Sequence, residues 1–266
     1  MLERVFASSE PLDATKHRIL ACSDRYDSPT AERVLPDGAV HLIFNFGDRQ
    51  AGERGADLTC LAMGATCTST RIVLTGVVEQ LCVRLRVGHA SAILGVPAGE
   101  LTDHGVALDA LWGRDASDTL ERLQALPPGA PRSAFLRDRL QARQGRAEAP
   151  SRPTLEAVRR IARSAGRLRV RDLAADLGVS ERRLQQLFHQ HVGLTPRAMC
   201  RLARFRDVLA RCSQRTQPWS EIALDGGYFD QAHFSNEIRS FTGLTPRELA
   251  RSGGFGFFQE DCLPSG

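Results

Sequence analysis

Apolar and polar positions alternate in two stretches of the first half of the chain. In 40–46, Val, Leu, Phe and Phe occupy every second position, and 81–87 alternates more strictly, with Cys or Arg between the apolar residues. Period-two alternation is typical of half-buried β-strands. We therefore predict strands over these two stretches and a third over Arg71–Val78. The Gly- and Thr-rich region between them, 50–70, is predicted to be a loop.

Helical spacing replaces this alternation from about residue 90 onward. Leu120, Leu123 and Leu126, for example, recur on one side of a helix. Helices are predicted over 90–94, 108–112, 116–126 and 132–144. The stretch 145–153 is rich in Gly, Ala, Pro and Arg, a composition typical of linkers. We therefore predict an α+β N-terminal domain, β-rich with helices, over 1–144, and a linker over 145–153.

The second half carries the end signals of several short helices. Ser, Thr and Asp side chains accept hydrogen bonds from the free N–H groups at helix starts, and the expected N-caps are Thr154, Ser180, Thr195, Ser220 and Asp230. Helices are predicted over 154–164, 170–177, 181–189, 196–212, 221–224 and 231–239, and from 246 onward. Thr245 and Glu248 form an expected capping box. We predict an all-α C-terminal domain over 154–252 and a tail over 253–266.

One five-residue string occurs twice in this domain. Gly-Leu-Thr-Pro-Arg occupies 193–197 and returns at 243–247. Each copy follows a short predicted helix and precedes one that begins with Pro, and each of those short helices follows a Gly-containing turn. A duplicated unit of this kind predicts two tandem helix-turn-helix units, which suit a protein that binds two neighbouring pieces of DNA.

The second copy resembles the DNA-binding domain of AraC/XylS-type transcription regulators. The resemblance is strongest over 230–236 (Asp-Gln-Ala-His-Phe-Ser-Asn), Ile238–Arg239 and 241–246 (Phe-Thr-Gly-Leu-Thr-Pro). The family usually has an aromatic residue where Ile238 stands. The resemblance implies a seven-helix domain with two helix-turn-helix units joined by one long helix, here 196–212.

A weaker resemblance covers the first half. The segments 33–38, 95–103 and 108–112 are similar to a poorly characterised N-terminal domain that a subset of these regulators carries. The family resemblance implies a bacterial transcription factor whose partners are double-stranded DNA and RNA polymerase, and an activator rather than a repressor. The sequence shows neither a membrane span nor the layout of a secretory signal at its start, so a cytoplasmic location is expected. It also implies that the N-terminal domain senses a signal, dimerises, or does both.

The polar sides of the two recognition helices supply candidate DNA contacts. Arg can bind guanine through two hydrogen bonds, Gln and Asn can bind adenine in the same way, and Ala can touch a thymine methyl. The candidate base-contacting residues are Glu181, Arg182, Gln185 and Gln186 in the first unit and Gln231, Ala232, Ser235 and Asn236 in the second. The candidate contacts to the DNA backbone are Ser180, Arg197, Arg201, Arg239 and Arg247. The alternative, a polar side that only faces solvent, is disfavoured by the duplication.

Charge is distributed in agreement with this assignment. Residues 1–150 hold 17 basic and 19 acidic residues, a net charge of −2, and 151–266 hold 18 and 12, a net charge of +6. A basic excess suits a domain that faces phosphates. The chain has no Cys-x-x-Cys, Gly-x-Ser-x-Gly or His-Glu-x-x-His motif. We therefore expect no metal, no cofactor and no enzymatic activity. No apolar run approaches the ~18 residues of a membrane span.

Two other functions stay open at this stage. A thiol-based DNA-repair or sensor enzyme half, fused to the same DNA-binding domain, would use a reactive cysteine such as Cys60 or Cys67. A sequence-blind architectural protein would bind DNA without base contacts. The sequence does not identify a small-molecule effector or the operator, and a homodimer is compatible with it. The three Phe residues of the tail, Phe255, Phe257 and Phe258, predict that it packs on one of the domains.

Overall fold

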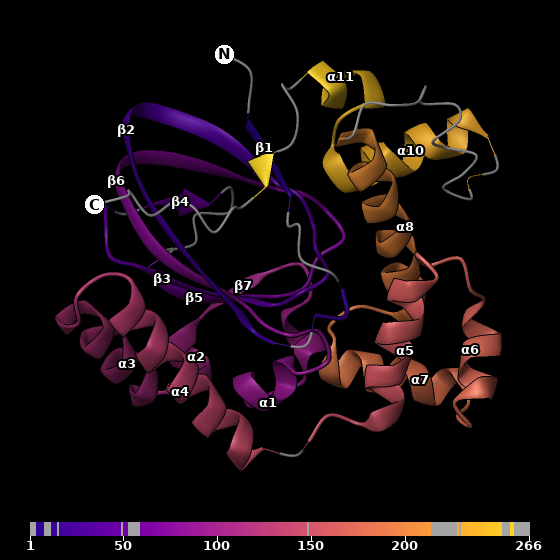
Figure 1. The fold of residues 1–266 in the computed structure, drawn as a ribbon, viewed down its shortest axis with the longest axis horizontal. Helices are drawn as coiled ribbons and strands as arrows, with labels where there is room; N and C mark the ends of the chain where they lie inside the picture. The colour runs from indigo at the N-terminus through magenta and orange to yellow at the C-terminus, as the bar shows by residue number, and fades with distance from the viewer. Residues whose placement is uncertain are drawn as a thin grey trace.

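The computed structural model describes residues 4–7, 12–14, 16–48, 50–52, 59–147, 149–213, 228, 230–251 and 256–257. A β-rich N-terminal part with helices beside it lies against a helical C-terminal part, whose elements are arranged along one long helix (Figure 1). The fold is therefore an α+β N-terminal domain followed by an all-α C-terminal domain, as the sequence predicts.

One mixed sheet forms the centre of the N-terminal domain. Its order is β7-β5-β3-β6-β2-β1-β8, and β4 pairs with β6 outside this path. The strands are β1 (Arg4–Ala7), β2 (Arg18–Val34), β3 (His41–Asn45), β4 (Ala51–Gly52), β5 (Cys60–Met63), β6 (Thr70–Arg84), β7 (Gly105–Ala107) and β8 (Gly256–Phe257). The long strands β2 and β6 are antiparallel from Arg18↔Arg84 to Val34↔Thr70, with a register shift between Tyr26 and Thr30. They form the two curved ribbons of Figure 1.

Three strand predictions need correction. The predicted strands 71–78 and 81–87 are one continuous strand, β6, because the residues between them keep their pairing with β2 and β3. The region 50–70, predicted as a loop, contains β5, which pairs with β3 and β7. The longest strand, β2, was not predicted at all. Much of its middle is exposed, so it lacks the alternation that a half-buried strand shows.

The core of this domain lies between the sheet and five helical segments. They are α1 (Ala90–Leu94), η1 (Ala98–Leu101), α2 (Leu108–Trp112), α3 (Arg114–Ala125) and α4 (Ala130–Arg146). Leu42, Phe44 and Val83 of the sheet and Ile93 of α1 are fully buried. Trp112 fixes the contact between helices, because its indole N–H donates to the Ile93 carbonyl at 3.0 Å.

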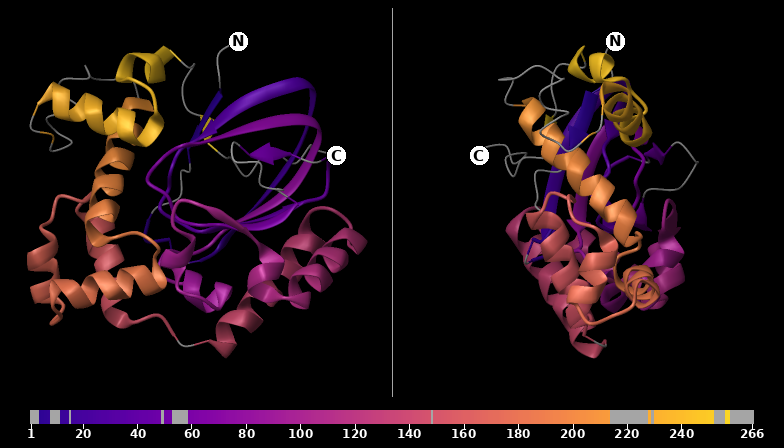
Figure 2. Two further views of the ribbon diagram at one scale, coloured as in Figure 1. Left: turned by 180° about the vertical axis from the view of Figure 1, so that it is seen from behind. Right: turned by 90° about the vertical axis from the view of Figure 1, so that its right-hand side faces the viewer.

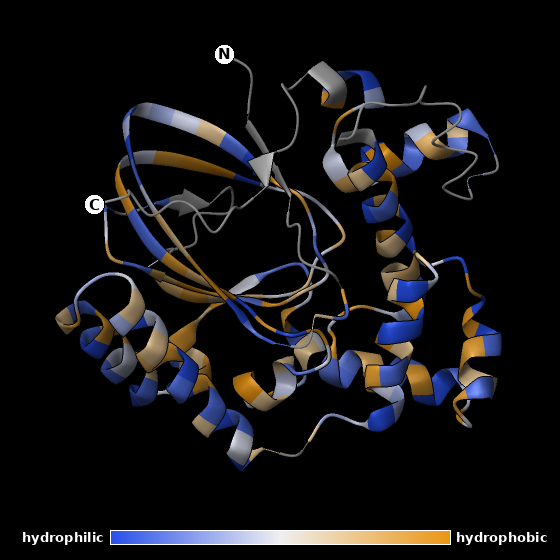
Figure 3. Cartoon of the chain, in the orientation of Figure 1, coloured by the Kyte–Doolittle hydropathy of each residue, from blue (hydrophilic) through white to orange (hydrophobic). Residues whose placement is uncertain are grey.

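The C-terminal helices agree closely with the predicted ones. They are α5 (Arg152–Arg163), α6 (Val170–Asp176), α7 (Glu181–His191), α8 (Pro196–Ser213), α10 (Gln231–Thr242) and α11 (Pro246–Arg251). In Figure 3 they carry alternating polar and apolar bands, as expected of helices with one buried side. The predicted helix 221–224, its cap Ser220 and the turn 226–227 lie outside the described residues.

Most of the predicted caps are present, with one exception. Backbone N–H groups donate to Ser180 Oγ, Thr195 Oγ1 and Asp230 Oδ1, and Thr245 and Glu248 form the capping box. Thr154, however, is not the N-cap of α5. Ser151 caps that helix, and Thr154 lies inside its first turn, fully buried, with its backbone N–H donating to Ser151 Oγ. The chain between α4 and α5 is thus 147–151, shorter than the predicted linker.

The tail prediction is confirmed where the structure describes the tail. β8 adds to the N-terminal sheet in parallel with β1, in the register Phe6↔Gly256 and Ala7↔Phe257. Phe255 and Phe258 lie outside the described residues. Across the ranges that the structure describes, none of the helices is long and apolar enough to cross a membrane.

Candidate nucleic-acid interface

The predicted first recognition helix, α7, has one buried and one open side. Leu184, Leu187 and Phe188 are buried against the domain. Of the predicted base-contacting residues, Arg182, Gln185 and Gln186 are exposed and Glu181 is half-buried. Arg183 is also exposed, and its guanidinium donates to Gln186 Oε1 at 3.5 Å. It was not among the predicted contacts, although its place beside Arg182 in the first turn was a visible signal.

The predicted second recognition helix, α10, repeats this division. Phe234, Ile238 and Phe241 are buried, and the Tyr228 ring packs edge-to-face on Phe234 with the centroids 5.2 Å apart. Among the predicted base-contacting residues, Gln231, Ala232 and Asn236 are exposed and Ser235 is half-buried. Both helices thus expose polar side chains that can hydrogen-bond to base edges, which is what a helix in the major groove requires.

The long helix α8 holds the two recognition helices apart. They lie near its opposite ends in Figure 1, and the right-hand view of Figure 2 looks nearly along both of them. Phe205 of α8 stacks on Phe241 of α10 with 4.7 Å between ring centroids. At the other unit, Arg204 donates to the Gly166 carbonyl after α5 at 3.0 Å. Each unit is therefore fixed to α8 by side chains as well as by the chain itself.

The predicted backbone-contacting arginines fall into two groups. Arg197, Arg239 and Arg247 are exposed. Arg201 is about half exposed, and its Nε lies 2.8 Å from Oε1 of Glu237, a buried residue of α10. The Arg201 guanidinium also lies over the Phe241 ring, 5.3 Å from its centroid. Arg201 therefore joins α8 to α10, and this structural role is independent of its predicted contact to the DNA backbone.

Glu237 is the polar residue of this region that the sequence analysis missed. It is 4% exposed and occupies the apolar side of α10, between Phe234 and Phe241 along the chain. An ionised carboxylate in that place needs a basic partner, and Arg201 supplies one. The signal was available in the sequence, since a Glu three residues after one buried Phe and four before another cannot face solvent on a regular helix.

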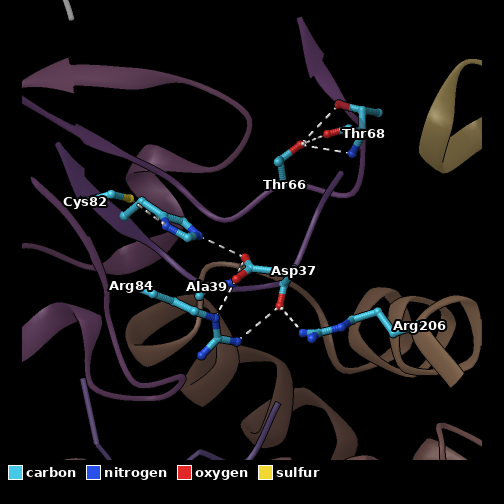
Figure 4. A network of polar contacts seen from close by, with 8 residues as sticks. Asp37, Ala39, Thr66, Thr68, Cys82, Arg84 and Arg206 are labelled. Carbon is cyan, nitrogen blue, oxygen red and sulfur yellow. Dashed lines mark hydrogen bonds and ion pairs between the residues drawn. The ribbon is translucent and has the colours of Figure 1, made fainter. Parts of the chain in front are cut away.

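A buried charge cluster joins the N-terminal domain to α8 (Figure 4). The carboxylate of Asp37 accepts hydrogen bonds from His41 Nε2 at 3.0 Å and from Arg84 Nε at 2.5 Å, while Arg206 of α8 donates to the Asp37 backbone carbonyl at 3.0 Å. Burial alone would raise the pKa of Asp37, but His41 and Arg84 hold it well below its usual range. Burial opposes the charge of His41 too, yet Asp37 raises the pKa of that imidazole to about 10.

Burial opposes the ionisation of the two candidate reactive thiols. Cys60 and Cys67 are half-buried, and burial raises the pKa of each to about 11. Reactive cysteines have lowered pKa values instead. This finding argues against the thiol-based alternative for these two residues. Among the residues that the structure describes, no three His, Cys, Asp or Glu side chains lie close enough together to hold a metal ion.

Comparisons with known proteins agree with this geometry. A sequence model of a helix-turn-helix domain matches residues 173–252, and the family described as "Domain of unknown function (DUF6597)" matches residues 7–107. The HTH-type transcriptional regulator ArgR of Pseudomonas aeruginosa is 34% identical over 91 residues, which are 32% of this chain and 27% of that protein. The matched part is therefore about a quarter of the relative's length.

Two kinds of solved structure are similar to the chain. ToxT from Vibrio cholerae O395 covers 90% of this chain and 98% of its own, with 9% identity and a TM-score of 0.45. The AraC-like transcriptional activator CuxR covers 79% of this chain and 80% of its own, with 15% identity and a TM-score of 0.29.

The described C-terminal elements, in which α8 connects α7 to α10, lie mostly within the matched helix-turn-helix domain. The chain is therefore similar to a helix-turn-helix domain over residues 173–252 and to the domain of unknown function over residues 7–107, and 91 of its residues are similar to a transcription regulator.

Proposed function

We propose that this protein is a sequence-specific DNA-binding transcription regulator that contacts two adjacent major grooves with α7 and α10. The observation that carries the proposal is the repetition of one arrangement at the two ends of α8. In each unit a capped helix buries three apolar side chains and exposes Gln, Arg, Ala or Asn on its other side.

The length of α8 suits two grooves on one face of a duplex. Its 18 residues span about 27 Å at ~1.5 Å per residue. One turn of B-DNA is about 34 Å, and the recognition helices extend beyond the ends of α8, so modest DNA bending would complete the match. Arg182 is the proposed guanine contact, and Gln185, Gln186, Gln231 and Asn236 are the proposed adenine contacts.

Contacts to phosphates would hold the protein in place without selecting a sequence. The exposed Arg197, Arg239 and Arg247, together with the N-cap Ser180, are the proposed contacts, and Arg201 adds to them where its ion pair with Glu237 allows. Each arginine that neutralises one phosphate steepens the dependence of log K on log salt by about one unit.

The N-terminal domain is proposed to sense a signal, a small molecule among the candidates, and to pass it to the DNA-binding half. RNA polymerase and a second copy of the chain are further proposed partners. Activation is the proposed outcome, from the family resemblance alone, and the cytoplasm of a bacterium is the proposed location.

Selection of bound fragments from random DNA tests the proposal. We expect an enriched sequence with two half-sites about one helical turn apart, bound at least ~10³-fold more tightly than random DNA. Gln185→Ala with Asn236→Ala should weaken binding to that sequence and leave binding to random DNA nearly unchanged. Gln124→Ala with Gln141→Ala, at exposed positions of α3 and α4, is the matched control. Equal affinity for all sequences would support an architectural protein instead.

A further inference from the structure

The N-terminal domain binds the chain at the C-terminal end of both recognition helices. After α7, the Thr102 hydroxyl donates to the Gly193 carbonyl at 2.5 Å. After α10, Arg33 Nη1 and the Ser69 hydroxyl both donate to the Thr242 carbonyl at 3.0 Å. Three side chains of the first domain thus satisfy backbone carbonyls at the starts of the two repeated Gly-Leu-Thr-Pro turns.

These two acceptors lie one residue apart in the register of the repeat. Gly193 and Gly243 open the two copies of the string, and Thr242 immediately precedes the second one. The last carbonyls of a helix have no partner within the helix, so an outside donor there fixes the helix end. The Ser69 backbone N–H adds a fourth bond, to the Phe241 carbonyl at 2.8 Å. Equivalent ends of the two DNA-contacting helices are therefore held by one body.

Packing strengthens the contact at α7. A Cβ built on Gly99 of η1 would lie 2.3 Å from Cδ2 of His189, so the backbone of η1 touches the recognition helix itself. Ser91 Oγ lies 2.9 Å from Nδ1 of His191, the last residue of α7. Between the two helix ends, Arg206 of α8 donates to the Asp37 carbonyl. The N-terminal domain therefore contacts both recognition helices and the helix that joins them.

We propose that Thr102, Ser69 and Arg33 are positioning residues for DNA binding. Through their hydrogen bonds the N-terminal domain links α7 to α10 in addition to the link that α8 provides, and we call this link the second connector. This second connector fixes the spacing of half-sites that the protein accepts. The inference rests on the proposed function, since it needs two half-sites that are bound at the same time.

Half-site spacing is a demanding test of such a connector. One inserted base pair moves the second half-site about 3.4 Å along the duplex axis and turns it by about 34° around that axis. A protein whose units are joined only through α8 absorbs part of this change at the helix ends. A protein whose units are also joined through the N-terminal domain must break contacts or distort the DNA, and it loses affinity.

The experiment measures the Kd of the full-length protein for its selected operator and for the same operator with one base pair inserted or removed between the half-sites. The variant Thr102→Val, Ser69→Ala, Arg33→Met removes the three donors. The matched control is Thr75→Val, Ser28→Ala, Arg25→Met, at exposed positions of the same sheet. Thr102→Ser keeps the hydroxyl and should behave as the parent does.

For the triple variant we expect the affinity ratio between the original and altered spacings to fall about tenfold, which equals about 1.4 kcal/mol. Base preference within each half-site should not change, and the control should keep the parental ratio. An unchanged ratio in a folded triple variant overturns the inference. If the triple variant does not fold, the affinity ratio between the original and altered spacings is measured for Thr102→Val and Thr102→Ser instead. Equal ratios for these two variants overturn the proposal. If the parent binds all DNA equally, the proposed function fails instead.

Discussion

The substitution Asp37→Asn tests whether the buried charge cluster stabilises the folded protein. Asp37 is 6% exposed and Arg84 only 1%, and their side chains lie 2.5 Å apart. Asparagine has nearly the same shape as aspartate but no charge, so the buried Arg84 and the half-buried His41 would be left without an anion. Removing one partner of a buried ion pair costs about 3–5 kcal/mol. That is a large part of the ~5–15 kcal/mol that stabilises a typical protein.

The pH dependence of this loss has a defined sign. The pKa of His41 is raised to about 10 from an ordinary value of ~6.5. Its ion pair therefore contributes fully below about pH 6.5 and is lost as the pH rises toward 10. The pKa of Asp37 is lowered, so its contribution is present above about pH 4 and is lost as the pH falls through the folded-state value. The difference between parent and variant should be largest near pH 6.

Urea unfolding followed by circular dichroism at pH 6 and pH 9 measures both effects. The control, Asp118→Asn in α3, changes an exposed carboxylate and should alter the free energy of unfolding by less than ~0.5 kcal/mol. A loss below about 1 kcal/mol for Asp37→Asn at pH 6 would show that the cluster contributes little. A loss that is greater at pH 9 than at pH 6 would refute the role given to His41.

Two further predictions concern the helix α8 and the thiols of Cys60 and Cys67. Phe205→Ala, which removes the ring stacked on Phe241, should lower the free energy of unfolding by about 3–5 kcal/mol, and a Phe205→Leu variant that loses almost nothing would argue against the stacking. Cys60 and Cys67, with pKa values near 11, should react with iodoacetamide at pH 8 more slowly than a cysteine peptide does; mass spectrometry of the alkylated protein locates any faster thiol, which would revive the thiol-based alternative.

Local signals explain why the C-terminal domain could be predicted in detail. A helix start depends on residues within four positions of one another, so Ser180, Asp230 and the pair Thr245 and Glu248 identify theirs directly. Thr154 was wrongly predicted to be the N-cap of α5 because another capping residue lies within the same few positions. Ser151, three residues earlier, is equally able to cap, and its two following residues, Arg152 and Pro153, suit a first helical turn.

The N-terminal sheet was predicted only in part because strand pairing is not local. β2 gains its partner β6 from a segment about fifty residues away, and its exposed middle, near Asp24 and Arg25, resembles a polar loop in the sequence. Asp37, in the segment between β2 and β3, meets Arg84 of β6, 47 residues away in the chain. The spacing of these two residues in the sequence does not predict that they form an ion pair.

The contacts between the domains were beyond sequence analysis for a different reason. The acceptors at Gly193 and Thr242 are backbone carbonyls, which every residue has. The residue type at these positions therefore does not indicate that the carbonyl accepts a hydrogen bond from another domain. The donors Thr102, Ser69 and Arg33 are ordinary polar residues. What the sequence did show was the repeat of the turns themselves, which the structure places against one domain.

The second connector has a consequence for signalling through thermodynamic linkage. A ligand changes DNA affinity only by the difference in its own affinity for the DNA-competent and incompetent arrangements, and DNA changes ligand affinity by the same factor. If Thr102 and the pair Arg33 and Ser69 hold the two helix ends, a ligand of the N-terminal domain that shifts one of these donors relative to the other alters the spacing of α7 and α10. Operators of different spacing would then change the affinity for that ligand unequally. The triple variant should remove this inequality while leaving ligand affinity in the absence of DNA unchanged, which calorimetry on the two operators can measure once a ligand is found.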